Sequence, residues 1–299
     1  MLKAVMLGAK NNDQGDTCPY CGSNDFVEKY GFDYNRSGLV QKYHCKRCNK
    51  WFRDRRGFEK MKNQATVVVA ALDLYYRGLS LRQIAEHLES LHGVKVSYGA
   101  IYCWLRKYVQ LIHTYIHSNL RVRTSERWHA DDTVVKVRGR NLVIWGLLDS
   151  QTRFLIALHL SERKTAEEAS QLIRKGLNVS QDLPLEIVTD GLSSYGKALE
   201  NEFSARNTNS KIVHLQGPLT GPLNNNKMER FYGTLKKRIK TMGHLNNITG
   251  AKMFTKGFPI YYDFIRKHKA LRGFTPAEVA GVANRKLSWM QLIQEASKS

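Results

Sequence analysis

Three apolar segments joined by short turns, near the middle of the 299-residue chain, restrict its fold more than any other feature. The first lies within Trp128–Arg140, where β-branched valines precede a closing Gly139, and this composition predicts a β-strand. Apolar runs at Leu142–Leu148 and Phe154–Leu160 predict two more strands. Because the turns between the three are short, we expect an antiparallel meander.

Helices and strands alternate after the meander. The capping-box pattern Thr165-Ala-Glu-Glu168 predicts the start of a helix that ends near Lys175. The remaining expected elements are a strand at Glu186–Asp190, a helix at Ser194–Glu202, a strand at Lys211–Leu215 and a long helix from Asn224 through Met242. A meander followed by such alternation predicts an α/β domain with a mixed five-stranded sheet.

Two adjacent aspartates, Asp131 and Asp132, lie early in the first of these strands. Side chains alternate along a strand, so Asp131 shares one face with Val135. Asp132 shares the opposite face with Val134. A half-buried carboxylate beside valines is costly unless it is paired or binds a metal. The alternative is that both are solvated acids at the start of a strand.

A third acid, Asp190, ends the predicted strand Glu186–Asp190, directly before Gly191. If that strand lies parallel beside the first one, at the usual spacing of about 4.8 Å, Asp131 and Asp190 can approach each other. Ligand sites in such sheets favour the carboxyl ends of strands. Whether the acids meet therefore depends on the strand order.

The long predicted helix supplies one more carboxylate. Its apolar stripe consists of Met228, Phe231, Tyr232, Leu235, Ile239 and Met242. Glu229 and Lys236 are seven residues apart, so they lie at nearly the same angle, at the edge of that stripe. Glu229 is thus placed to face a site at the sheet edge, with Lys236 near a phosphate. The alternative is a capping box, in which Glu229 satisfies an amide at the helix N-terminus.

The charge balance points to a polyanionic partner. Forty-seven Lys+Arg against 26 Asp+Glu give a net charge of +21 and a pI near 9.8. Nucleic acid and an anionic membrane surface both fit this charge. No apolar run approaches the roughly 20 residues of a membrane span, and no segment has the pattern of a basic amphipathic anchor, so nucleic acid is favoured. The N-terminus has no signal-peptide pattern, and we expect a cytosolic protein.

Four of the five cysteines form a CxxC…CxxC pattern, Cys18/Cys21 and Cys45/Cys48. Two such knuckles present four thiolates to one structural Zn²⁺, with a hairpin expected in the gap between them. The basic and aromatic flanks suit DNA phosphates, with Arg47, Arg53 and Arg55 as the candidate contacts. The alternative is a solvated basic surface. The fifth cysteine, Cys103, is expected to be a small buried hydrophobe.

The helical patterns from Phe58 to about Tyr115 follow one another as in a helix-turn-helix. Ser80 and Ser97 are the expected N-caps of its two helices. The inward positions are expected to be Ile84, Ala85, Leu88, Ile101, Trp104 and Leu105. The second helix is expected to present to a DNA groove the side chains of Ser97, Tyr98, Tyr102 and Arg106. A generic three-helix bundle is the alternative.

Four sequence blocks carry a resemblance to a known family. They are WHADDTVVKVRGR, VTDGLSSY, LNNNKMERFYGTLKKRIK and YYDFIRKHKALRGFTPAEVAG, which together span about residues 126–281. In this order they resemble the blocks of prokaryotic insertion-sequence transposases with an integrase-type DDE catalytic core. A zinc ribbon and a helix-turn-helix are also usual in front of that core. The resemblance implies an RNase H-like catalytic domain of the retroviral-integrase type.

The resemblance also implies the site residues. Asp131, Asp190 and Glu229 match the family's metal-binding triad, and the family pattern selects Asp131 rather than Asp132. Lys236 matches the basic residue seven positions after the glutamate. Phosphates of the DNA are expected to contact Lys136, Arg138, Lys237, Arg238 and Lys240.

The expected organisation is a tail (residues 1–15), a zinc ribbon (16–56), a helix-turn-helix domain (57–125), the catalytic domain (126–282) and a C-terminal helical tail (283–299). The chain departs from the family in one respect. Thirty-eight residues separate Asp190 from Glu229, a few more than in close relatives, and we expect the surplus in the loop Gln216–Asn224.

The activity that the resemblance implies is DNA transposition. Two Mg²⁺ (or Mn²⁺) ions held by the triad support hydrolysis that frees a 3′-OH at an element end, and joining of that 3′-OH to target DNA. The implied partners are element ends, target DNA and at least one further copy of the chain, in the prokaryotic cytoplasm at the nucleoid. Two alternatives remain: a catalytically silent DNA-binding protein or repressor, and a nuclease that nicks without joining.

Overall fold

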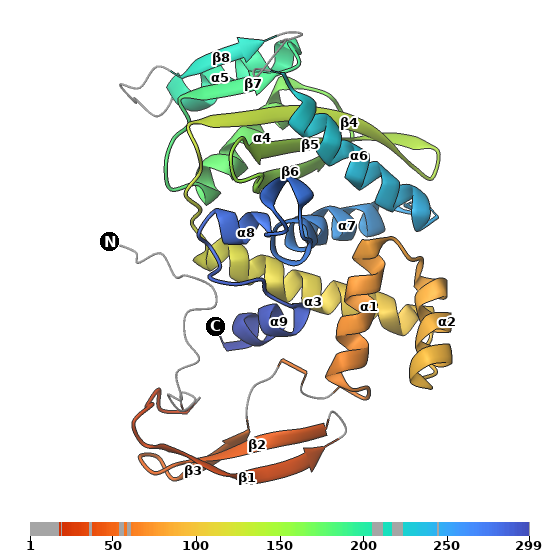
Figure 1. Cartoon of the computed structure of the whole chain (residues 1–299), viewed down its shortest axis with the longest axis vertical. Coiled ribbons are helices and arrows are strands. Elements are labelled where there is room, and N and C mark those ends of the chain that lie inside the picture. Colours follow the sequence, from red (N-terminus) through yellow and green to blue (C-terminus); the bar gives the residue numbers. More distant parts are fainter. Residues whose placement is uncertain are drawn as a thin grey trace.

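The structure is a computed structural model that describes residues 18, 20–35, 38–53, 57–58, 61–204, 212–216, 224–243 and 245–298. A small sheet near the N-terminus, a group of helices and a larger α/β layer follow one another along the molecule (Figure 1). None of the described helices combines the length and the hydropathy that a membrane crossing requires.

The small sheet is antiparallel, in the order β1-β2-β3, with strands β1 (Val27–Asn35), β2 (Gly38–Cys45) and β3 (Lys50–Arg53). The β1–β2 hairpin fills the gap between the two cysteine pairs, as predicted, and its turn residues 36–37 lie outside the described residues. Tyr43 stacks on Phe52 at 5.3 Å between ring centroids. This sheet has little apolar area to bury, which is typical of small domains that a bound metal stabilises.

Three helices follow: α1 (Ala65–Arg77), α2 (Leu81–His92) and α3 (Tyr98–Asn119). The Ser80 and Ser97 side chains accept hydrogen bonds from the backbone at the starts of α2 and α3, so both predicted N-caps are confirmed. Helix α3 continues to Asn119, a turn beyond Tyr115, where the predicted helical region ends. The predicted inward positions are buried, with Ala85 partly buried, whereas Cys103 is exposed. The prediction for Cys103 was wrong because position 103 points away from the face that buries Ile101 and Trp104.

The large sheet has the order β6-β5-β4-β7-β8. Its strands are β4 (Arg127–Val137), β5 (Arg140–Asp149), β6 (Leu155–Ser161), β7 (Glu186–Thr189) and β8 (Val213–Gln216). Strands β4, β5 and β6 form the expected antiparallel meander, whereas β7 and β8 run parallel to β4. The first strand of the meander is therefore central, and the predicted RNase H-like mixed sheet is confirmed.

Helices cover both faces of this sheet. Helices α4 (Ala166–Val179) and α5 (Ser193–Ser204) pack against each other, and the close approach of Gly176 to Leu147 places α4 on one face. Helix α6 (Asn226–Thr241) packs on the other face, where Met228 lies against Gly146. Gly146 and Leu147 are neighbours on β5 and point to opposite faces, which fixes this arrangement.

The capping box predicted at the start of α4 does not form. Thr165 is the N-cap, but its side chain makes no capping hydrogen bond. The Glu168 carboxylate instead lies 2.5 Å from His159 Nε2 on β6. A hydrogen bond to the sheet thus replaces the local bond that the sequence pattern suggested.

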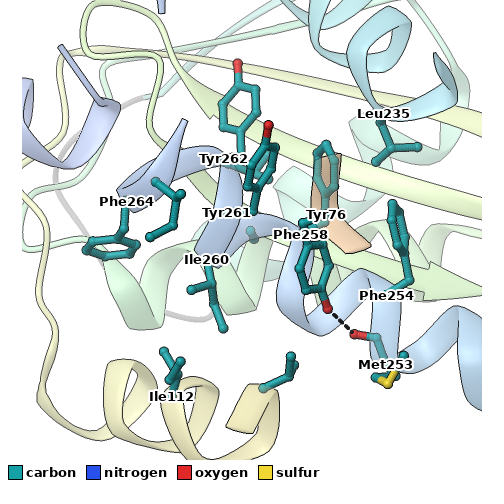
Figure 2. Close-up of a cluster of buried hydrophobic side chains, with 14 of the residues drawn as sticks. Tyr76, Ile112, Leu235, Met253, Phe254, Phe258, Ile260, Tyr261, Tyr262 and Phe264 are labelled. Atoms are coloured by element: carbon teal, nitrogen blue, oxygen red, sulfur yellow. Dashed lines mark hydrogen bonds between the residues drawn. The ribbon is translucent and has the colours of Figure 1, made fainter. Parts of the chain in front are cut away.

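A shared aromatic core joins the helical region to the α/β layer (Figure 2). Helix α7 (Ile248–Ile260) continues into a π-helix, η2 (Tyr261–Ile265). Tyr76 of α1 stacks on Phe254, Tyr261 and Trp289 and donates a hydrogen bond to Met253 O at 3.4 Å. The short helices η3 (Lys269–Leu271) and α8 (Pro276–Val279) lead to α9 (Trp289–Lys298), which carries Trp289 back onto α1. The helical region that begins with α1 therefore packs against the C-terminal helix α9.

Candidate active site

Two carboxylates meet where β4 and β7 run side by side. These strands are parallel, with His129 paired to Val188, so two residues further along Asp131 comes level with Asp190, just past the end of β7. Carboxylate oxygens of Asp131, Asp132 and Asp190 all lie within 4.8 Å of one another. The expectation that Asp131 and Asp190 approach across neighbouring parallel strands is thus confirmed by the register.

The electrostatics of this cluster suit a cation. Burial raises the pKa of Asp131 to about 7, and repulsion from Asp190 and Asp132 adds to the shift. The Asp132 backbone N–H, which donates to Asp131 Oδ1 at 2.8 Å, opposes it. A divalent cation would remove the like-charge repulsion, and hard carboxylate oxygens are the donors that Mg²⁺ prefers. The donor set therefore fits a magnesium-type ion.

Asp132 occupies the opposite face of β4, as strand alternation predicted. One of its oxygens lies 2.9 Å from Lys164 Nζ, and its side chain is only 3% exposed. Its other oxygen, Oδ1, is buried and has no hydrogen-bond partner among the described residues. Burial raises the pKa of Asp132, and the Lys164 ammonium opposes that shift. The ion pair fixes Asp132 to the chain that leads into α4.

Glu229 lies outside the cluster of three aspartates. It is in the first turn of α6, its side chain is exposed, and its carboxylate has no hydrogen-bond partner among the described residues. The helix N-cap is Asn225, which makes no side-chain capping bond. The capping-box explanation for Glu229 is therefore wrong.

Two contacts fix the face of α6 that meets β4. Asn225 Nδ2 donates to Ala130 O at 3.3 Å, and Tyr232 Oη donates to Asp131 O at 2.5 Å. With about 100° of rotation per residue, Glu229 lies within roughly 60° of both contact residues. Glu229 thus projects from the side of α6 that borders Asp131, and Lys236 lies two turns further along almost the same line.

A buried hydrogen-bonded chain beside the acids was not expected. Burial lowers the pKa of His129 to about 4, so its ring is neutral near pH 7. His129 Nδ1 lies 3.2 Å from Asn225 Oδ1 and therefore carries the proton, which leaves Nε2 to accept from Ser150 Oγ at 3.3 Å. Lys227 Nζ donates to the same hydroxyl at 2.6 Å. Strand alternation places His129 on the Asp131 face, and that was the available signal.

A family model described as DDE domain, DDE_Tnp_IS240, matches residues 125–269. The chain carries a DDE domain. The matched residues include β4 through α7, and with them Asp131, Asp190 and Glu229. The DDE domain thus coincides with the sheet that brings the aspartates together, and it agrees with the family that the sequence blocks resemble.

Solved viral integrase structures are similar to part of the chain at low identity. A chain of the simian T-cell lymphotropic virus intasome in complex with PP2A regulatory subunit B56 gamma is 17% identical, with a TM-score of 0.42, over 54% of this chain and 56% of that chain. The magnesium-bound dimeric HTLV-2 integrase catalytic core domain is 14% identical, with a TM-score of 0.40, over 54% and 97%. The BIV integrase catalytic core domain is 15% identical, with a TM-score of 0.38, over 52% and 93%. No curated protein matched the chain.

The basic residues expected to contact DNA within the DDE domain differ in their surroundings. Lys136 and Arg138 are exposed at the β4–β5 hairpin, and Lys236, Lys237 and Lys240 are exposed along α6. Arg238 instead donates to the Arg77 carbonyl oxygen at 2.5 Å and lies over the Tyr261 ring. Its guanidinium joins α6 to α1, so it is less available to a phosphate than its neighbours on α6.

The four cysteines before the DDE domain converge. Sγ–Sγ distances are 3.6 Å for Cys18–Cys48 and for Cys21–Cys45, and all four sulfurs lie within 4.8 Å of one another. Tetrahedral zinc with bonds of about 2.3 Å places sulfurs about 3.8 Å apart. The predicted ligands are thus brought together in a geometry that fits one Zn²⁺.

The remaining DNA-contact predictions fall on the N-terminal elements. Arg47 is exposed, Arg53 pairs with Asp33 at 2.8 Å, and Arg55 lies outside the described residues. At the start of α3, Tyr98 is 57% exposed, while Ser97 caps the helix through its side chain. Tyr102 is partly exposed and Arg106 is exposed. The described side chains of this set are at least partly accessible at the surface, as a DNA contact requires.

Proposed function

We propose that this chain is a DNA transposase whose DDE domain cuts and joins DNA strands at Asp131, Asp190 and Glu229. The observation that supports the proposal most strongly is the meeting of Asp131 and Asp190 across parallel strands inside a DDE domain. Glu229 completes the set from α6, whose contacts to Ala130 and Asp131 hold the helix against the same strand.

The three carboxylates would hold two Mg²⁺ or Mn²⁺ ions, which supply a nucleophile activated at one ion and a leaving oxygen stabilised at the other. Asp131 supports this role because burial and two neighbouring carboxylates raise its pKa, and a bound cation would favour its charged form. Lys236, exposed two turns beyond Glu229, is placed to hold a DNA phosphate, with Lys237 and Lys240 beside it.

The reaction has two steps of the same kind. In the first, a water oxygen bonds to the phosphorus at the element end, the bond from phosphorus to the 3′-oxygen breaks, and that oxygen leaves as a 3′-OH. In the second, this 3′-OH oxygen bonds to a phosphorus of target DNA and displaces a target 3′-oxygen. One phosphodiester replaces another in the joining step, so no covalent enzyme intermediate is needed.

Recognition of the element ends falls to the elements in front of the DDE domain. A zinc ribbon held by Cys18, Cys21, Cys45 and Cys48 and the exposed start of α3 are the proposed reading surfaces. Joining two ends requires at least two copies of the chain, so we include a homodimer or larger assembly in the proposal. A protein that acts on the chromosome in this way works in the prokaryotic cytoplasm, at the nucleoid.

The test is a cleavage and strand-transfer assay on DNA that carries the element ends, with Mg²⁺ or Mn²⁺. Asp131→Asn, Asp190→Asn and Glu229→Gln are each expected to reduce both steps by more than about 100-fold, because losing even an outer contact of a metal site costs 10–100-fold. Each variant is expected to bind the same DNA as tightly as the wild type does. Full activity in any of the three would remove that residue from the proposed site.

Two other results would replace the proposal. Tight DNA binding with no cleavage under either metal ion would identify a silent binder or repressor. Nicking without joining of the 3′-OH to a second duplex would identify a nuclease.

A further inference from the structure

A group of cations beside the acid cluster takes no part in the chemistry described above. The turn between β5 and β6 carries Ser150 and Arg153, and Lys227 at the start of α6 donates to Ser150 Oγ at 2.6 Å. Arg153 has a left-handed backbone (φ 60°), and its N–H donates to Asp149 O at 3.2 Å. This tight turn and the Lys227–Ser150 contact bring Arg153 and Lys227 to the same end of β5, and Arg230 lies about one turn beyond Lys227 on α6. The positive charges of Lys227 and Arg230 repel that of Arg153.

None of these three cations forms an ion pair with a carboxylate of the described residues. Asp149 lies near, but its two oxygens already accept four hydrogen bonds, from the backbone N–H and hydroxyl groups of Ser125 and Thr152, at 2.6–2.8 Å. Glu186, at the start of β7, pairs with Arg127 at 2.5 Å. Asp149 and Glu186 are therefore already engaged.

Such an arrangement is costly in the protein alone. Arg153 and Lys227 are both partly buried, so water screens their repulsion less than it would at an open surface. An anion supplied from outside would offset that cost, and a guanidinium beside an ammonium binds phosphate well. Both side chains keep part of their surface exposed, so an external anion can reach them.

The three cations are linked to the aspartate cluster through Ser150 and His129. Ser150 Oγ, which Lys227 contacts, also lies 3.3 Å from His129 Nε2, and His129 precedes Asp131 by two residues on the same face of β4. Two residues of strand span about 7 Å, and the His129–Ser150 and Ser150–Lys227 contacts add to that distance. At about 3.4 Å of axial rise per nucleotide, the cations lie a few nucleotides from Asp131. A DNA strand with its reacting phosphate at Asp131 would pass these cations within a few nucleotides.

We propose that Arg153, Lys227 and Arg230 form a phosphate-binding site that holds the DNA strand within a few nucleotides of the reacting phosphate. The inference rests on the proposed function for its ligand, a phosphodiester, but its test does not depend on catalysis. Lys227 also hydrogen-bonds to Ser150, which contacts His129, and His129 in turn contacts Asn225. A phosphate bound at Lys227 would therefore contact one end of the hydrogen-bonded series that joins α6 to β4.

The experiment measures DNA affinity of the full chain over a range of salt concentrations, with no divalent ion added. Arg153→Gln and Lys227→Gln each remove one charge, and glutamine at position 227 retains a donor for Ser150. Both residues are expected to hold the same phosphate. Each single variant should therefore reduce the slope of log affinity against log salt by about 0.9. The double variant should reduce the slope by the same amount and not by twice as much. Lys298→Gln on α9, matched in charge but remote in the chain, should leave the slope unchanged.

Equal slopes in the wild type and in both variants would overturn the inference. A second measurement uses inorganic phosphate as the probe: if phosphate raises the melting temperature only when Arg153 and Lys227 are present, while the DNA slopes stay equal, the site binds free phosphate and the DNA inference fails. The proposed function is judged separately. Loss of the slope effect with intact cleavage contradicts only the phosphate site, and an active Asp131→Asn variant contradicts only the catalytic assignment.

Discussion

Tyr232 Oη donates a 2.5 Å hydrogen bond to the backbone carbonyl of Asp131. The same hydroxyl lies 3.2 Å from the carbonyl of Ile144 on the neighbouring strand. One side chain of α6 thus hydrogen-bonds to two neighbouring strands beside the aspartate cluster. Because Glu229 is on the same side of α6, this contact sets how far Glu229 lies from Asp131.

Tyr232→Phe is therefore expected to loosen α6 against β4. Loss of a buried hydrogen bond should lower the free energy of unfolding by about 1–2 kcal/mol and reduce strand joining by at least about 10-fold, as displaced outer contacts of metal sites do. Chemical denaturation and the strand-transfer assay measure the two effects. The matched control is Tyr195→Phe, because the buried Tyr195 hydroxyl has no hydrogen-bond partner among the described residues. Equal behaviour of the two variants would contradict the positioning role.

The raised pKa of Asp131 predicts a pH dependence of the metal-free protein. Its pKa is about 7 in the folded chain against an ordinary 3.8, so between these values the folded state keeps a proton that the unfolded state loses. The free energy of unfolding should fall as pH rises through this window, by at most about 1.4 kcal/mol per pH unit. Asp131→Asn removes this pH dependence of the free energy of unfolding. Denaturation curves of both proteins from pH 4 to pH 7 should therefore diverge, and parallel curves would count against the burial of this carboxylate.

The cysteine cluster predicts that a chelator acts first on the N-terminal sheet. Structural zinc replaces a core that these few residues lack, so chelation should unfold the sheet and weaken binding to element ends while the larger core persists. Cys18→Ser and Cys45→Ser should behave as chelated protein does. Cys103→Ser is the control, because Cys103 is exposed and lies outside the cluster. End binding that survives in the Cys18 and Cys45 variants would disprove the role of zinc.

Gly257 on α7 permits the close packing of α1 against α7. A Cβ there would lie 1.9 Å from Tyr76 Oη and 2.5 Å from Tyr76 Cζ. Gly257→Ala should therefore destabilise the chain by at least about 1–3 kcal/mol, as overpacking does. Gly233→Ala on α6 is the matched control, since nothing lies within 4 Å of a Cβ there, and alanine should stabilise the helix by up to about 1 kcal/mol. Melting temperatures of the two variants should shift in opposite directions, and a shared direction would contradict this account.

Local chemistry made several parts of this protein predictable from its sequence. Four thiols at CxxC spacing, capping serines at Ser80 and Ser97, and β-branched runs joined by short turns each specify their structure within a few residues. The opposite faces of Asp131 and Asp132 follow from strand alternation alone. The triad itself came from a resemblance to a family, because alternation did not say which aspartate matters.

Tertiary structure decided what depends on distant partners. The Glu168 carboxylate contacts His159 of β6 instead of capping α4. The Arg238 guanidinium contacts the carbonyl of Arg77, at the end of α1, instead of pointing into solvent. Only the parallel pairing of β7 with β4 brings Asp190 to Asp131, and only packing places His129 between Ser150 and Asn225. A local pattern determines which contacts a residue can make nearby. The choice among them is settled by burial and charge contributed from segments far along the chain.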